Sequence, residues 1–159
     1  MPDPARPVIA SWVKYLAKVI GEPNTQTILL GHSIGCQAIL RYLSTLQPGL
    51  KIRGVILVAP WVQLTEASYE APEDREIAQP WIETPIDWEA VRNHIPEGKA
   101  TAIFSDNDPF VPLSNANVFK KELRAKVLVE HSLYHINTEA GIKELQPALD
   151  EIISMSGSE

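Results

Sequence analysis

Four short, largely apolar runs alternate along this sequence with longer stretches in which apolar residues recur at helical spacing. Each run is bounded by Gly, Pro or polar residues and fits a β-strand that is buried on both faces. Strands that alternate with helices are joined by crossover connections, which build a mainly parallel sheet covered by helices on both faces. The sequence therefore predicts a three-layer α/β fold. The predicted strands are residues 27–30, 54–59, 100–104 and 125–129.

The stretches around these strands predict five helices. The first, at residues 8–21, places Trp12 and Leu16 on one apolar face, and Gly21 ends it. Pro147 is expected to break or restart the last helix, because a proline inside a helix removes a hydrogen bond. The other predicted helices are residues 34–46, 87–94, 113–124 and 138–153.

Residues 61–88 differ from the rest of the chain, because they are rich in proline and acidic residues and show little periodicity. A connection of this length inside a compact domain is uncommon, and such segments often serve as lids or binding loops. At this chain length a single hydrophobic core is expected. We therefore predict one domain over residues 1–159 with a lid-like excursion at 61–88.

Charge and composition narrow the classes of partner. The chain has a formal net charge of −6 and no run of Lys or Arg, so neither nucleic acid nor a membrane surface is an expected partner. No apolar run approaches the roughly 20 residues that span a bilayer, and no secretion signal opens the chain, so a cytoplasmic location is expected. The single cysteine, Cys36, is predicted to be a small buried residue, and no Cys/His cluster indicates a metal site. No cofactor is expected.

The pentapeptide Gly31-His32-Ser33-Ile34-Gly35 follows the first predicted strand and opens the next predicted helix. A G-x-S-x-G sequence in this setting is typical of a sharp turn that exposes a nucleophilic serine above a parallel sheet. Glycines suit such a turn, because the serine backbone is forced toward positive φ and neighbouring side chains would clash. Ser33 is therefore the predicted nucleophile, and the backbone amide of Ile34 is the predicted oxyanion donor.

A serine hydroxyl needs a base to remove its proton and an acid to orient that base. In sites of this kind the acid and the histidine follow the serine in chain order, on loops after later strands. The third predicted strand runs into Asp106 and Asp108. We predict that Asp108 is the acid, because Pro109 favours an extended conformation there and removes the next amide as a competitor for the carboxylate. Asp106 is left with a local role in the turn.

The fourth predicted strand runs into His131 and, four residues later, His135. His135 is the predicted base, since it lies in a loop just before the expected helix cap Thr138, from where an imidazole can reach across the top of the sheet. His131 is still near the strand, and His94 falls on a helix away from any strand end.

Six segments spread along the chain match one known pattern, namely GHSIG at 31–35, VILVAP at 55–60, PW at 80–81, DWEAV at 87–91, SDNDPFVP at 105–112 and HINTEAG at 135–141. In these segments the chain resembles the small serine hydrolases of the retinoblastoma-binding-protein-9 type. The resemblance implies an α/β-hydrolase fold, the same roles for Ser33, Asp108 and His135, and esterase or peptidase-like acyl transfer. We interpret the chain as a serine hydrolase that acts on a small ester or amide through an acyl-enzyme on Ser33.

The chain departs from this family in two places. Tyr134 stands before the histidine where the family usually has Gly, so the loop is expected to present His135 differently. The opening residues MPDP resemble a segment that in the family follows two strands and a helix, so an amino-terminally truncated fold is expected. The loop after the first of those strands ordinarily supplies a second oxyanion amide, and losing one such donor typically costs about 10²–10³ in kcat.

Two further expectations follow from this truncation. The alternative to an active enzyme is a weak or inactive relative that binds a ligand or a protein through the old pocket. In addition, the strand at 27–31 would lack a neighbour on one side, and an unpaired apolar edge is a template for pairing with another chain. We therefore predict that the chain self-associates through residues 27–31 or is markedly unstable. No L-x-C-x-E motif occurs, so a retinoblastoma-protein partner is not implied.

Overall fold

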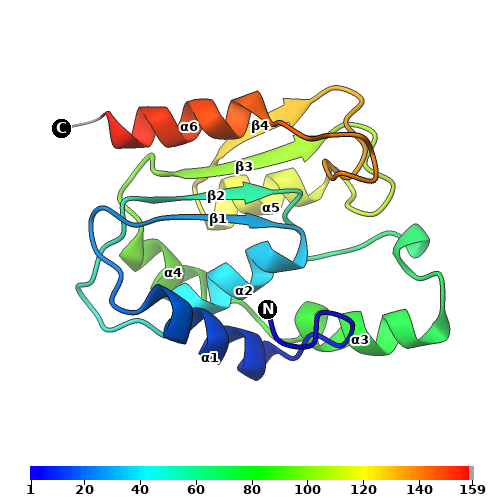
Figure 1. Ribbon diagram of the computed structural model, residues 1–159, viewed down its shortest axis with the longest axis horizontal. Coiled ribbons are helices and arrows are strands. Elements are labelled where there is room, and N and C mark those ends of the chain that lie inside the picture. The colour runs from blue at the N-terminus through cyan, green and yellow to red at the C-terminus, as the bar shows by residue number, and fades with distance from the viewer. Residues whose placement is uncertain (158–159) are drawn as a thin grey trace.

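The computed structural model describes residues 1–157, which form a four-stranded parallel sheet between two layers of helices (Figure 1). The strands lie side by side in chain order, with Leu29 opposite Val55 and Val55 opposite Ala100. The predicted α/β class and its parallel sheet are confirmed. The strands are β1 (Ile28–His32), β2 (Gly54–Val58), β3 (Ala100–Ser105) and β4 (Lys126–Glu130).

The interior and edge strands differ in burial. Every residue of β2 and β3 is buried, which explains why their sequences are apolar without alternation. In β1 and β4, at the two edges of the described sheet, Leu30 and Val129 are exposed. An edge position for β1 is what the expected pairing through residues 27–31 requires, and that self-association stays a prediction.

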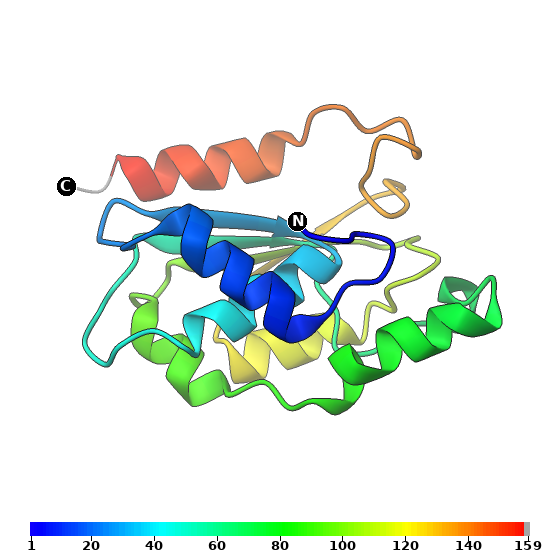
Figure 2. The same ribbon diagram turned by 60° about the horizontal axis from the view of Figure 1, so that its bottom comes forward.

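Helices cover the two faces of the sheet unequally (Figures 1 and 2). One face packs against a large apolar cluster that includes Leu57 and Phe104, and the other against a smaller cluster that includes Ile56 and Ile103. Successive strand residues point to opposite faces, so neighbouring residues of β2 serve different clusters. The larger layer holds α1 (Ile9–Ile20), α2 (Ile34–Leu43), α4 (Trp88–His94) and α5 (Asn115–Glu122), and the smaller one α6 (Gln146–Ser156).

The segment 61–88 contains a helix that its weak periodicity did not indicate. After a short 3₁₀ turn, η1 (Glu66–Ser68), the chain forms α3 (Pro72–Glu83). Pro72 occupies the first turn, where a missing N–H costs nothing, and the Asp74 carboxylate accepts a hydrogen bond from the Ala71 amide. Trp81 is the one buried residue of this helix, so no apolar stripe marks it in the sequence.

The predicted helix 138–153 is wrong in its first part. Residues 138–141 form a turn, residues 142–145 have no regular structure, and α6 begins at Gln146 with Pro147 in its first turn. The Asn137 side chain accepts a hydrogen bond from the Ala140 amide, a local bond that competes with helix formation. Within residues 1–157, no helix has the length and apolar character that crossing a membrane requires.

Candidate active site

Ser33 occupies the sharp turn between β1 and α2. Its backbone has φ 50° and ψ −121°, a conformation that a residue with a side chain rarely adopts. Two backbone hydrogen bonds hold this turn, because the Ser33 amide donates to Val58 O at 2.9 Å and the Ser33 carbonyl accepts from the Cys36 amide. The predicted strand–turn–helix setting of the serine is therefore present.

The two glycines beside Ser33 have different reasons to be glycine. A Cβ at Gly31 would lie 2.8 Å from Ile39 Cδ1 and 3.0 Å from the Cys36 amide nitrogen, so no larger residue fits. A Cβ at Gly35 would meet nothing within 4 Å. The expected clash is confirmed at Gly31 and is wrong at Gly35.

The helix α2 begins at Ile34, directly after the serine. The first amides of a helix have no intrahelical acceptor, and the helix dipole favours negative charge beside them. The Ile34 amide therefore has the position and the free donor that a developing oxyanion next to Ser33 requires.

His135 and Asp108 form a buried hydrogen-bonded pair. The His135 Nδ1 and Asp108 Oδ2 atoms are 2.8 Å apart, and the two side chains are 13% and 2% exposed. An ionised carboxylate only accepts, so Nδ1 carries the proton and Nε2 of a neutral His135 is left as the acceptor. The other carboxylate oxygen, Oδ1, accepts from the Phe110 and Val111 amides at 2.9 and 3.0 Å. Pro109 has no N–H to compete for the carboxylate, as expected, and the two amides beyond it bind only Oδ1.

A second Asp–His pair lies beside the first. His131 Nδ1 is 2.6 Å from Asp106 Oδ2, yet the two side chains are 87% and 36% exposed. The Ser132 amide also donates to Asp106, and this hydrogen bond, with the one from His131, holds the pKa of Asp106 below its ordinary value. Asp106 lies in a turn, as expected, and its carboxylate in addition links two loops.

Polar side chains after β3 fix the loop that carries His135. Asn107 Oδ1 accepts from the Tyr134 amide and from the Ser105 hydroxyl, both at 2.8 Å, and Ser105 Oγ accepts from the Leu133 amide. Tyr134 adopts φ 50°, a left-handed conformation that favours glycine. The departure from the family pattern at this position is therefore accommodated as backbone strain, and the hydrogen bonds that the loop amides donate to Asn107 and Ser105 hold this backbone in place.

His32 contacts the same loop from β1. Its Nε2 atom is 2.8 Å from the His135 carbonyl oxygen, and the two rings meet edge to face with their centroids 4.8 Å apart. Burial lowers the pKa of His32, and Nε2 is the donor in this hydrogen bond because a carbonyl oxygen only accepts. His32 thereby supports the backbone of His135.

Ser33 and His135 line one cavity of about 400 Å³, together with Trp61 and Phe110. Within residues 1–157, no hydrogen bond joins Ser33 to His135, and the Ser33 hydroxyl accepts one from Trp61 Nε1 at 3.3 Å. Hydrogen bonds between catalytic groups are often long until a substrate binds. The missing bond between Ser33 and His135 therefore does not prevent the two side chains from contacting the same ligand. The cavity wall also carries three acidic side chains and no Lys or Arg; the acids are Glu70, Asp74 and Glu139.

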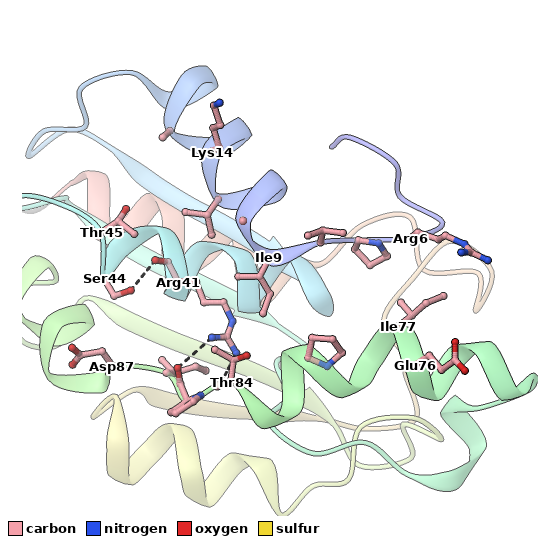
Figure 3. A pocket seen from close by; sticks show the side chains of 18 of the residues that line it. Arg6, Ile9, Lys14, Arg41, Ser44, Thr45, Glu76, Ile77, Thr84 and Asp87 are labelled. Carbon is pink, nitrogen blue, oxygen red and sulfur yellow. Dashed lines mark hydrogen bonds between the residues drawn. The ribbon is translucent and has the colours of Figure 1, made fainter.

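A larger hollow of about 990 Å³ lies between α1, α2 and α3, away from Ser33 and His135 (Figure 3). Inside it, the buried Arg41 guanidinium donates to the carbonyls of Trp81, Thr84 and Pro85 at 2.9, 2.7 and 3.3 Å. The Trp81 carbonyl lies in the last turn of α3 and the other two directly follow the helix, so Arg41 caps its carboxyl end. In this hollow Arg41 anchors the end of α3, whereas Ser33 and His135 line the other cavity. Among residues 1–157, no cluster of three His, Cys, Asp or Glu side chains is placed to hold a metal ion.

The parallel sheet, the turn at Ser33 and the acid and histidine loops define an α/β-hydrolase-like protein. Its fold is similar to the crystal structure of the ydeN gene product from Bacillus subtilis, with a TM-score of 0.83 and 23% sequence identity. That superposition covers 98% of this chain and 78% of the other. A family model described as serine hydrolase matches residues 1–153, so the chain belongs to the serine hydrolase family.

Two relatives agree with this assignment. The chain is 39% identical over 59 residues to YdeN of Bacillus subtilis, a match that covers 37% of this chain and 31% of YdeN. It is 26% identical over 127 residues to serine hydrolase RBBP9 of Rattus norvegicus, covering 80% of this chain and 61% of RBBP9. Both matches span less than two thirds of the relative. The predicted resemblance to retinoblastoma-binding-protein-9-type hydrolases is confirmed.

Several residues at the site were not predicted to act there. Trp61 lines the cavity, and its indole donates a hydrogen bond to the Ser33 hydroxyl. Asn107 and His32 received no role at the histidine loop. Their positions in the sequence could have indicated a place at the site, because Trp61 and Asn107 lie shortly after strands, where parallel sheets build their sites.

Proposed function

We propose that the protein hydrolyses a small ester or amide through an acyl-enzyme on Ser33, with His135 as the base and Asp108 as its orienting acid. The observation that carries this proposal is the cavity shared by Ser33 and His135, since the buried carboxylate of Asp108 lies directly behind that histidine. A triad is recognised by such roles and geometry.

In the first step, His135 Nε2 removes the proton of Ser33 as its oxygen attacks the substrate carbonyl carbon. The carbonyl electron pair moves to oxygen, where the Ile34 amide stabilises the negative charge. The tetrahedral intermediate then collapses, and the leaving group takes the proton from His135. Asp108 holds Nδ1 throughout and stabilises the imidazolium.

In the second step, water attacks the acyl carbon and gives its proton to His135. The bond from the acyl carbon to Ser33 Oγ breaks, and His135 returns the proton to that oxygen. The products are a carboxylic acid and the free enzyme. No metal ion or cofactor enters either step.

Reaction with a fluorophosphonate probe tests this function. We expect one probe to attach per chain and peptide mapping to locate it on Ser33, with labelling lost in Ser33→Ala. The matched control is Ser68→Ala, because Ser68 lines the same cavity and its hydroxyl donates to the Phe110 carbonyl. Labelling that persists in Ser33→Ala contradicts the proposal.

The rival function is a module that binds a ligand or protein without turnover. Thermal unfolding of the same sample separates the two, because a cooperatively folded protein that the probe does not label supports the rival. A folded protein labelled at Ser33 supports the enzyme.

A further inference from the structure

Trp61 places a hydrogen-bond donor on the oxygen that the proposed reaction uses. Its indole Nε1 lies 3.3 Å from Ser33 Oγ, although Trp61 comes from the loop after β2 and Ser33 from the turn after β1. From this contact we propose that Trp61 is a catalytic residue that stabilises negative charge on Ser33 Oγ. The inference rests on the proposed function.

The indole is held rigidly. Trp61 is only 3% exposed, and its backbone carbonyl accepts from the Gln37 side chain of α2 at 2.7 Å. Directly after it, the Val62 and Gln63 amides both donate to Asn115 Oδ1 of α5. The backbone at Trp61 is therefore fixed from two helices, so the donor needs little reorganisation during the reaction.

An indole N–H can stabilise negative charge on Ser33 Oγ, but it cannot act as the base. An indole N–H donates and does not accept, so Trp61 leaves the Ser33 proton to His135. A donor strengthens its hydrogen bond when the acceptor gains charge, and beside a buried side chain such as Trp61 this gain is larger than in water. Trp61 therefore favours the charged form of the oxygen over the neutral hydroxyl.

Negative charge on Ser33 Oγ is greatest when the acyl-enzyme breaks down. After water has attacked the acyl carbon, the bond from that carbon to Oγ breaks and its electron pair stays on Oγ. The Trp61 N–H donates to this electron pair while His135 delivers the proton that completes the hydroxyl. Loss of the indole N–H is thus expected to slow deacylation more than acylation.

The direct test removes the indole N–H and keeps an aromatic side chain. In Trp61→Phe we expect kcat for p-nitrophenyl acetate to fall about tenfold, as for the loss of a hydrogen bond to a charged group, and KM to fall with it, because slower deacylation lowers both and leaves kcat/KM nearly unchanged. The burst of p-nitrophenol in the first turnover should become larger relative to the steady rate. Trp88→Phe is the matched control, because the Trp88 ring packs against Phe119 through its apolar surface.

Each outcome decides the inference. Wild-type kcat in Trp61→Phe, while Ser33→Ala is inactive, overturns the role of Trp61 and leaves the proposed function standing. Labelling that survives in Ser33→Ala refutes the proposed function, and the inference with it. If Trp61→Phe does not fold, benzothienylalanine at position 61 keeps the ring shape and replaces the N–H by sulfur, and the same loss of kcat is expected.

Discussion

Two Asp–His pairs stand side by side at the carboxyl edge of the sheet, and they differ in almost everything except distance. Each joins an aspartate after β3 to a histidine after β4, at 2.6 Å for Asp106–His131 and 2.8 Å for Asp108–His135. The first pair is exposed to solvent. The second is buried and borders the cavity that contains Ser33.

The difference teaches that a short contact does not by itself make a catalytic pair. Water and ions screen an exposed pair, whose contribution is small and whose side chains move freely. A buried pair is held in one orientation, here with His32 and Phe110 against the His135 ring. Under our proposal, Asp108–His135 serves the chemistry and Asp106–His131 fastens the loop.

Substitution of the two histidines should therefore give the largest difference in catalytic rate between the two pairs. We expect His135→Gln to lower kcat/KM for a p-nitrophenyl ester by about 10⁵-fold or to the background rate, because Ser33 loses its base. In the matched variant His131→Gln the rate should stay within about twofold of wild type. Equal losses in the two variants would remove the distinction between the pairs.

Substitution of the two aspartates should give the same contrast in kcat, with a smaller loss than substitution of the histidines. Asp108→Asn is expected to lower kcat by about 10⁴-fold, because an amide favours the wrong tautomer of His135. Asp106→Asn should keep most of the activity. Circular dichroism and thermal unfolding check that both variants fold, and a larger loss of kcat in Asp106→Asn would reverse our assignment.

The sequence alone was enough to predict the parallel sheet and the strand–turn–helix setting of Ser33. Short apolar runs mark the strands because β2 and β3 are buried on both faces, and the turn at Ser33 follows directly from its strand and helix neighbours. Chain order and strand ends then led to Asp108 and His135, which the structure brings together.

The remaining features depend on tertiary contacts that no local pattern carries. The helix α3 is anchored by the Arg41 cap and by Trp81, whose indole donates to the Pro7 carbonyl 74 residues earlier. The bond from Trp61 to Ser33 joins two loops, and Gln37 of α2 holds the backbone carbonyl of Trp61. Such contacts between distant residues leave no periodicity in the sequence.

The backbone strain at Tyr134 predicts a smaller effect, which concerns the stability of the protein. Tyr134 is exposed at φ 50°, so Tyr134→Gly should raise the free energy of unfolding by about 0.5–1 kcal/mol relative to Tyr134→Ala. Comparison with alanine removes the effect of losing the side chain. Urea unfolding measures the difference, and an alanine variant as stable as the glycine variant would mean that the loop carries no such strain.

The smallest expected effect is the contribution of Asp106 to stability. Its folded pKa lies below its unfolded value because of the hydrogen bonds from Ser132 and His131. Stabilisation by this carboxylate is therefore present above about pH 4 and is lost as pH falls through the folded pKa. The stability difference between wild type and Asp106→Asn should accordingly be present at pH 7 and fade in acid; a difference independent of pH would contradict this account.

The most direct test of the account is a crystal structure of the protein after reaction with a fluorophosphonate. We predict phosphorus bonded to Ser33 Oγ, a phosphoryl oxygen within hydrogen-bond distance of the Ile34 amide, and His135 beside the adduct with Nδ1 still on Asp108. His131 should remain in solvent with Asp106. An adduct on another residue, or His135 turned away from a phosphorylated Ser33, would contradict the claim that the buried pair serves this serine.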